Sequence, residues 1–185
     1  LRDYHHIHPV ADSLFDGLWH FSLKPKLSGK YSVYLDFIPL KSPRRVLLSS
    51  SFLVPGERST FKKREEKLSF SYRNLEFKLE KNSTDSYSDQ IQLTLTAKNE
   101  IGEDIDLHPV MGAFAHMVAF DPNLDGFAHL HPESAELPSS LNPTFNGPLS
   151  FGFAPPSNGL FRLWAQVKVS NSEEVFLPFD LDTRS

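Results

Sequence analysis

The sequence predicts an all-β protein built from antiparallel β-sandwich modules in tandem. Three observations lead to this prediction: several segments alternate apolar and polar residues at period two, fourteen prolines interrupt the 185-residue chain, and helical periodicity is nearly absent. A hydrophobic content of 39%, with sixteen phenylalanines, supplies enough material for packed cores. We therefore expect a folded chain of one large or two small domains made of short strands.

The predicted strands are short runs bounded by Asn, Gly, Pro or Ser. Four runs alternate clearly: "YSVYLDF" (residues 31–37), "LEFKLE" (75–80), "IQLTLT" (91–96) and "LFRLWAQVKV" (160–169). Two more, "SSFLV" (50–54) and "LPFDL" (177–181), are expected as closing strands. The segment "AHMVAFDPNLDGFAHLHP" (115–132) predicts a hairpin, because the polar residues 121–126 include Pro, Asn and Gly, which favour turns.

An internal repeat organises these strands. The run "YHHIHP" (residues 4–9) aligns with "FAHLHP" (127–132), and "LWHFSLKPKLSGKYSVYLDF" (18–37) lies without a gap over "PLSFGFAPPSNGLFRLWAQV" (148–167). "SSFLV" then corresponds to "LPFDL". Both copies therefore present the same order: His-x-His-Pro, a short strand, a Pro-then-Gly turn, a long alternating strand and a final strand with Phe.

The two copies are not equally complete, because only the second is preceded by further strands. We expect residues 1–56 to form the C-terminal half of a first sandwich module, residues 57–67 a charged linker, and residues 68–185 a complete second module of immunoglobulin-like or cupredoxin-like kind. Half a sandwich cannot bury its own apolar face. We therefore expect the first module to be completed by strands upstream, or to pack on the second module or on another chain by self-association.

Composition excludes several classes of function. The net charge of −4 offers no basic field for nucleic acid or an anionic membrane, and the absence of cysteine removes disulfides, thiolate zinc sites and cysteine nucleophiles. The most apolar run, residues 110–120, is interrupted by His116 and is too short for a transmembrane segment.

The histidines of the predicted hairpin indicate a metal site. Pairing Phe120 with Phe127 places His116 opposite His131, and residues that are opposed or two apart on antiparallel strands share a face. In the absence of a β-bulge, His116, His129 and His131 therefore project from one face. Three imidazoles suit a first-row metal, with zinc or copper favoured over calcium or magnesium, which prefer oxygen ligands.

Other candidate ligands are secondary. His108 and Met111 lie just upstream of the hairpin and could add an imidazole and a thioether to the site. In the first copy, His6 and His8 match His129 and His131, but no strand of this chain carries an equivalent of His116. The competing interpretation is structural: a histidine at a strand end beside proline often packs its ring and bonds a backbone carbonyl.

A family resemblance adds to this interpretation. The segment "GEDIDLHPVMGAFAHMVAFDPNLDGFAHLHPE" (residues 102–133), followed by "FAPPSNGLFRLWAQV" (153–167) and "FLPFDLD" (176–182), resembles exported bacterial β-sandwich modules of the YtkA-like kind. The Pro-Gly-aromatic strand is similar to one near the end of copper-resistance proteins of the CopC type. The likeness of layout covers residues 75–182 and partly 4–54. It implies an exported, periplasmic or cell-surface protein, such as a lipoprotein, associated with copper. The N-terminal histidine motif of CopC-type proteins is not matched, so their copper ligands are not carried over.

These observations give three hypotheses of function. The leading one is a non-enzymatic exported bacterial protein that binds copper or zinc through His116, His129 and His131. The alternative is a structural or adhesive cell-surface protein of immunoglobulin-like modules without metal. A third, a metal-dependent hydrolase with Glu133 as base, has the least support, because no further acid or base cluster accompanies the histidines.

Overall fold

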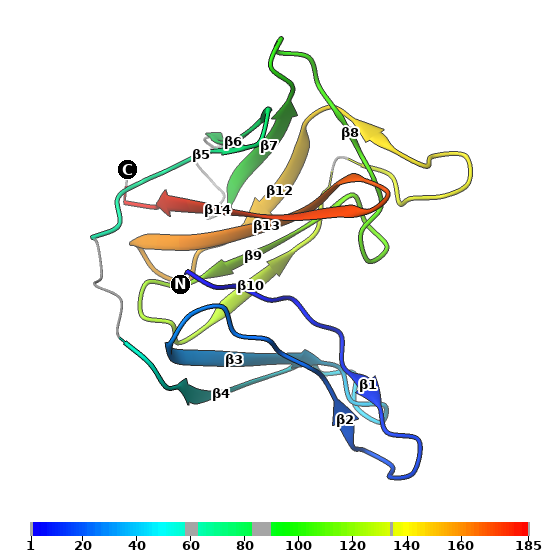
Figure 1. Cartoon of the computed structure of the whole chain (residues 1–185), viewed down its shortest axis with the longest axis vertical. Coiled ribbons are helices and arrows are strands. Elements are labelled where there is room, and N and C mark those ends of the chain that lie inside the picture. The colour runs from blue at the N-terminus through cyan, green and yellow to red at the C-terminus, as the bar shows by residue number, and fades with distance from the viewer. Residues whose placement is uncertain (1, 58–62, 83–89, 134, 185) are drawn as a thin grey trace. The chain divides into compact units, whose positions relative to one another are not determined.

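The computed structural model describes residues 2–57, 63–82, 90–133 and 135–184. The chain divides into two compact units, Leu1–Lys62 and Lys63–Ser185. Within the described residues, every strand pairing is antiparallel and no helix forms, so the all-β prediction is confirmed (Figure 1). The described part of the chain contains no helix that is long and apolar enough to cross a membrane.

The second unit is a β-sandwich of two four-stranded sheets. The β9 sheet has the order β10 (Phe127–Leu130), β9 (Ala115–Phe120), β13 (Leu160–Ser170) and β14 (Glu173–Asp182). The β7 sheet has the order β12 (Leu149–Phe153), β7 (Ile91–Lys98), β6 (Leu75–Asn82) and β5 (Ser69–Tyr72). A short pair, β8 (Asp106–Leu107) with β11 (Phe145–Asn146), accompanies them. The immunoglobulin-like or cupredoxin-like assignment stays a prediction.

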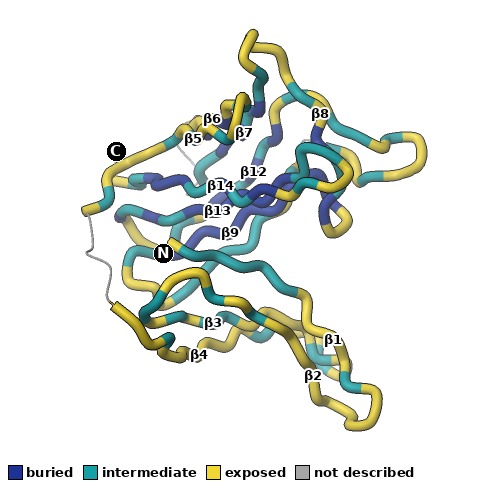
Figure 2. The backbone as a smooth tube through the Cα atoms, in the orientation of Figure 1, coloured by how far each residue is buried: buried dark blue, intermediate teal, exposed yellow. Residues whose placement is uncertain are grey.

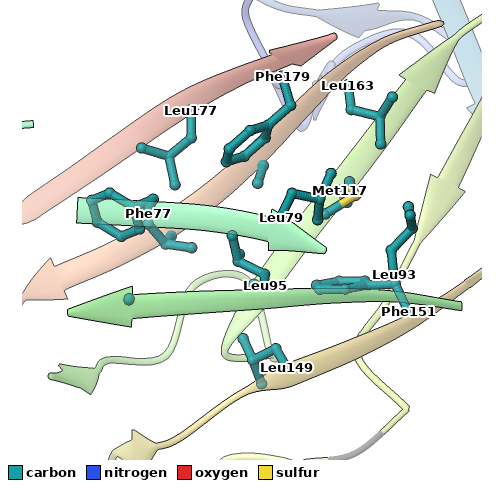
Figure 3. Close-up of a cluster of buried hydrophobic side chains, with 14 of the residues drawn as sticks. Phe77, Leu79, Leu93, Leu95, Met117, Leu149, Phe151, Leu163, Leu177 and Phe179 are labelled. Atoms are coloured by element: carbon teal, nitrogen blue, oxygen red, sulfur yellow. The ribbon is translucent and has the colours of Figure 1, made fainter. Parts of the chain in front are cut away.

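The core lies between these two sheets and follows from the alternation of their strands. Phe77 and Leu79 of β6 and Leu95 of β7 are at most 1% exposed and face the buried side chains of the β9 sheet (Figure 3). Met117 of β9 is fully buried there. Because β9 buries its odd-numbered residues in this core, its even-numbered residues point to the outer face of the β9 sheet.

The expected charged linker is partly a component of the second unit. Residues 58–62 lie outside the described residues, but the backbone of Lys67 exchanges hydrogen bonds of 2.8 and 2.9 Å with that of Asp180 on β14. The Arg64 guanidinium also donates to the Asp180 carboxylate at 2.9 Å. Residues 63–67 are therefore an arm fixed along β14, because Asp180 is buried and needs these donors.

The first unit consists of two separate ribbons. Strands β1 (Val10–Ala11) and β2 (Trp19–His20) form a short pair, and β3 (Gly29–Phe37) pairs with β4 (Val46–Val54) over nine residue pairs. Among its described residues none is buried, in contrast to the second unit (Figure 2). The stretch around His6 and His8, which aligns with strand β10, forms no strand.

The hairpin registers revise one part of the repeat alignment. Gly29 pairs with Val54, whereas Gly159 exchanges hydrogen bonds with Thr183. If Gly29 and Gly159 are equivalent, then Phe52, the cross-strand partner of Tyr31, is equivalent to Leu181, the cross-strand partner of Phe161. The alignment of "SSFLV" with "LPFDL" instead places Phe52 over Phe179, so it is wrong by two residues. A shift of two keeps the same face, so the apolar pattern of the two hairpins still matches. The tandem repeat itself stays a prediction.

Candidate metal centre

Strands β9 and β10 form the hairpin that the sequence predicted, in the predicted register. Phe120 pairs with Phe127 and Val118 with His129, with unbroken pairing to Met117 and Leu130. The loop is closed by the Asp121 carboxylate, which accepts hydrogen bonds from the backbone N–H groups of residues 123, 125 and 126. Because the pairing contains no bulge, the histidines of the two strands fall on one face, as expected.

Three histidines converge on this face. One nitrogen of each of His116, His129 and His131 lies within 4.8 Å of the others. The ring centroid of His131 is 4.8 Å from that of each of the other two, and the His116 and His129 centroids are 5.3 Å apart. His131 stands one residue beyond the end of β10, so its place follows from the direction of the strand rather than from a hydrogen-bonded pair.

The hydrogen bonds of His116 determine which of its nitrogens is free of a proton. Its Nε2 lies 3.1 Å from the carbonyl oxygen of Val110, which can only accept, so Nε2 carries the hydrogen and donates it. Nδ1 of the neutral ring is then a lone pair, and it faces His129 Nε2 at 3.1 Å. A backbone carbonyl that fixes the tautomer of one histidine is a usual support of metal sites.

A two-residue turn presents that carbonyl. Val110 and Ala113 exchange backbone hydrogen bonds of 2.8 and 3.1 Å around Met111 and Gly112. Both central residues have positive φ, 46° and 82°, as a type I′ turn requires. Sequence reasoning did not find this support for His116, because Met rarely adopts such a conformation; the Met-Gly pair before the hairpin was the available signal.

Burial decreases across the cluster from one end to the other. His116 is only 4% exposed, His129 is half-buried and His131 is exposed. An ion could therefore reach the cluster from the His131 side. Three protein nitrogens also leave a fourth tetrahedral position, which solvent can fill.

The comparisons with known proteins identify a family. The sequence profile of a family described as a domain of unknown function, DUF8832, matches residues 71–185. The chain belongs to the DUF8832 family. No curated protein and no solved structure matches it. The matched region contains all three clustered histidines and none of the first unit.

The structure does not bring the other predicted ligands into this cluster. His108 donates its backbone N–H to Lys168 O at 2.7 Å beside β13, and it is not a member of the three-histidine group. Met111 belongs to the turn that supports His116. In the first unit, the rings of His6 and His8 lie 5.3 Å apart and edge to face, and no third ligand joins them among the described residues.

Charged groups near the cluster are engaged elsewhere. The carboxylate of Glu133 accepts a hydrogen bond of 3.0 Å from Gln92 on β7, and Glu133 is not a member of the three-histidine group. Gln166 on β13 is the cross-strand neighbour of His116, and Arg162 lies on the same face of β13. The Arg162 guanidinium forms an ion pair with Asp180 at 3.0 Å. Burial lowers the pKa of this guanidinium from its ordinary value, and the opposing effect of Asp180 is smaller. The donor set is therefore three imidazole nitrogens.

Proposed function

We propose that this DUF8832 protein is a non-enzymatic metal-binding protein that holds zinc or copper through His116 Nδ1, His129 Nε2 and one ring nitrogen of His131. The observation that carries the proposal is the lone pair of His116, held toward the other two rings by the Val110 carbonyl. Nitrogens bound to one tetrahedral zinc ion lie about 3.3 Å apart, given zinc–nitrogen distances of ~2.0–2.1 Å. The His116–His129 separation of 3.1 Å is close to that value.

The donor chemistry limits the metal. Three imidazoles suit zinc and copper, whereas calcium and magnesium require oxygen ligands that this cluster does not offer. His129 donates its Nε2 hydrogen to His116 in the metal-free protein, so metal binding requires that hydrogen to move to His129 Nδ1 or to leave. The resemblance to YtkA-like and CopC-type modules favours copper, and it is also the basis for proposing an exported, periplasmic or cell-surface location in a bacterium.

One observation favours the alternative, a structural or adhesive surface protein without metal. The hydrogen bonds from His116 to Val110 and between His116 and His129 satisfy both rings of this pair without an ion. On this alternative the histidines stabilise the hairpin. The exposed ring of His131 meets the rings of His116 and His129 edge to face, and this alternative gives that arrangement no role.

Titration with zinc(II) and copper(II) separates the two functions. The variants are His129→Gln, which keeps an N–H donor for His116 but removes an imidazole, and His131→Ala; His108→Ala is the matched control. We expect one ion per chain for the wild type and the control, and a loss of at least ~100-fold in affinity for the two variants, since even supporting residues of metal sites contribute ~10–100-fold. Equally weak binding by the wild type and both variants would exclude the proposal.

A further inference from the structure

The place of His131 in the cluster depends on more than strand pairing. His116 and His129 lie on the paired strands β9 and β10, whereas His131 follows Leu130, the last residue of β10. A side chain beyond a strand end loses conformational entropy when it binds a metal. The ring of His131 nevertheless already stands 4.8 Å from each of the other two rings. Its backbone therefore needs a second anchor on the side away from β10.

Glu133 supplies that anchor with its backbone and its side chain. Its N–H donates a hydrogen bond of 2.8 Å to the carbonyl oxygen of Ser150 on β12. Its carboxylate accepts a hydrogen bond of 3.0 Å from the Gln92 amide on β7. We call these two bonds the Glu133 latch. Because β12 and β7 belong to the β7 sheet, the chain is held by one sheet at Leu130 and by the other at Glu133, with His131 between them.

Pro132 makes the link between the two anchors stiff. Its ring fixes the backbone φ of residue 132 at about −65° and restricts the preceding residue, His131, to extended backbone. Few free torsions are therefore left between the Glu133 latch and the His131 side chain. A displacement of Glu133 should consequently move the His131 ring.

A glycine on β12 leaves room for the Glu133 latch. Gly152 is the cross-strand partner of Gln92, and it points to the outer face of the β7 sheet because its neighbour Phe151 is in the core. A Cβ atom at residue 152 would overlap the Gln90 amide and lie 2.5 Å from Glu133 Oε1. The φ of Gly152 is outside the left-handed region. The space taken by these side chains, and not the backbone conformation, therefore requires glycine within this strand.

We propose that the Glu133 latch positions His131 as the third ligand of the metal centre. Glu133 is then a positioning residue that acts on the metal only through the backbone of His131. This inference rests on the proposed metal-binding function, and it adds a contribution from the second sheet. The β9–β10 hairpin supplies the ligands, while the β7 sheet holds the third ligand in place before the ion arrives, which reduces the entropic cost of binding.

Ring contacts in the metal-free protein test the latch without any ion. Nuclear Overhauser effects between the rings of His131 and His129 should be present in the wild type, since their centroids are 4.8 Å apart. We expect Glu133→Ala to lose them and Glu133→Gln, which keeps an oxygen to accept from Gln92, to retain them. Glu136→Ala, which removes an exposed carboxylate nearby, is the control with the same change of charge. Contacts that are missing from the wild type, or that persist in Glu133→Ala, would overturn the proposal.

Zinc titration separates positioning of His131 from general stabilisation. We expect Glu133→Ala and Gly152→Ala to bind zinc ~10-fold more weakly, at the lower end of the ~10–100-fold typical of supporting residues, and Glu133→Gln and Glu136→Ala to keep the wild-type affinity. In a His131→Ala background, Glu133→Ala should cause no further loss, because the latch acts through that ring alone.

The titration can contradict the latch and the metal centre separately. An additive loss in the His131→Ala/Glu133→Ala double variant, or wild-type affinity in Glu133→Ala, would overturn the latch while the wild type still binds zinc. A wild type that binds no zinc would refute the metal centre itself, and with it the role of the latch in binding, even if the ring contacts behave as expected.

Discussion

Zinc should stabilise the wild-type protein far more than a variant that lacks only an exposed histidine. At free zinc 100 times its dissociation constant, binding stabilises the folded state by ~2.7 kcal/mol. The second unit spans Lys63–Ser185, and about 120 residues at ~2.1 cal/mol/K each give an unfolding entropy near 0.25 kcal/mol/K. The melting temperature should therefore rise by about 10 °C.

The variant His131→Ala should lose most of this rise. If the remaining two histidines bind zinc ~100-fold more weakly, the same zinc concentration stabilises by only ~0.4 kcal/mol, about 2 °C. Without zinc the variant should melt within the range of ordinary surface substitutions, about 0.5 kcal/mol, because His131 is exposed. Circular dichroism melts with and without zinc measure both effects, with His108→Ala as control. A variant that keeps the full 10 °C shift would refute the role of His131.

Three further predictions follow from individual residues. Gly112→Ala places a side chain at φ 82° and should lower the free energy of unfolding by ~1–2 kcal/mol while weakening metal binding; unchanged urea midpoint and affinity would contradict the role of the turn. Phe179→Ala, in the core, should lower the free energy of unfolding measured with urea by ~3–5 kcal/mol. A loss under ~1 kcal/mol would mean that Phe179 is not packed in the core as described. The hydrogen bond from Arg184 lowers the pKa of Asp182 from 3.8 to about 2, with a smaller effect from Lys81. The stabilisation that the Asp182–Arg184 pair contributes is therefore present above pH 3.8 and lost as the pH falls toward 2. Asp182→Asn should reduce the acid dependence of the urea midpoint in that range. An identical dependence in the wild type and the variant would count against this pair.

The hairpin of the metal centre was predictable because its information is local. A loop with Asp121 at its start and Gly126 at its end sets the pairing of Phe120 with Phe127, and period-two geometry then places His129 relative to His116. The support from Val110 was not predictable in the same way. It depends on a left-handed backbone conformation at Met111, which tertiary packing selects against the preference of that residue.

The boundaries of the units were less accessible than the strands. A run of mixed charges such as residues 63–67 is typical of a solvated connector, yet Arg64 and Lys67 bind β14. Their partner, Asp180, lies more than a hundred residues away in the sequence and inside an apolar strand. Pattern analysis cannot pair such distant groups, because the ion pair exists only once both strands are in place.

Histidine ¹⁵N spectroscopy of the labelled protein tests the proposed site most directly. In the metal-free protein, His116 should show a protonated Nε2 and an unprotonated Nδ1. One equivalent of zinc should then shift His116 Nδ1, His129 Nε2 and one nitrogen of His131, and leave the signals of the other five histidines in place. Zinc that shifts no histidine, or that shifts those of the first unit instead, would contradict the three-histidine metal site.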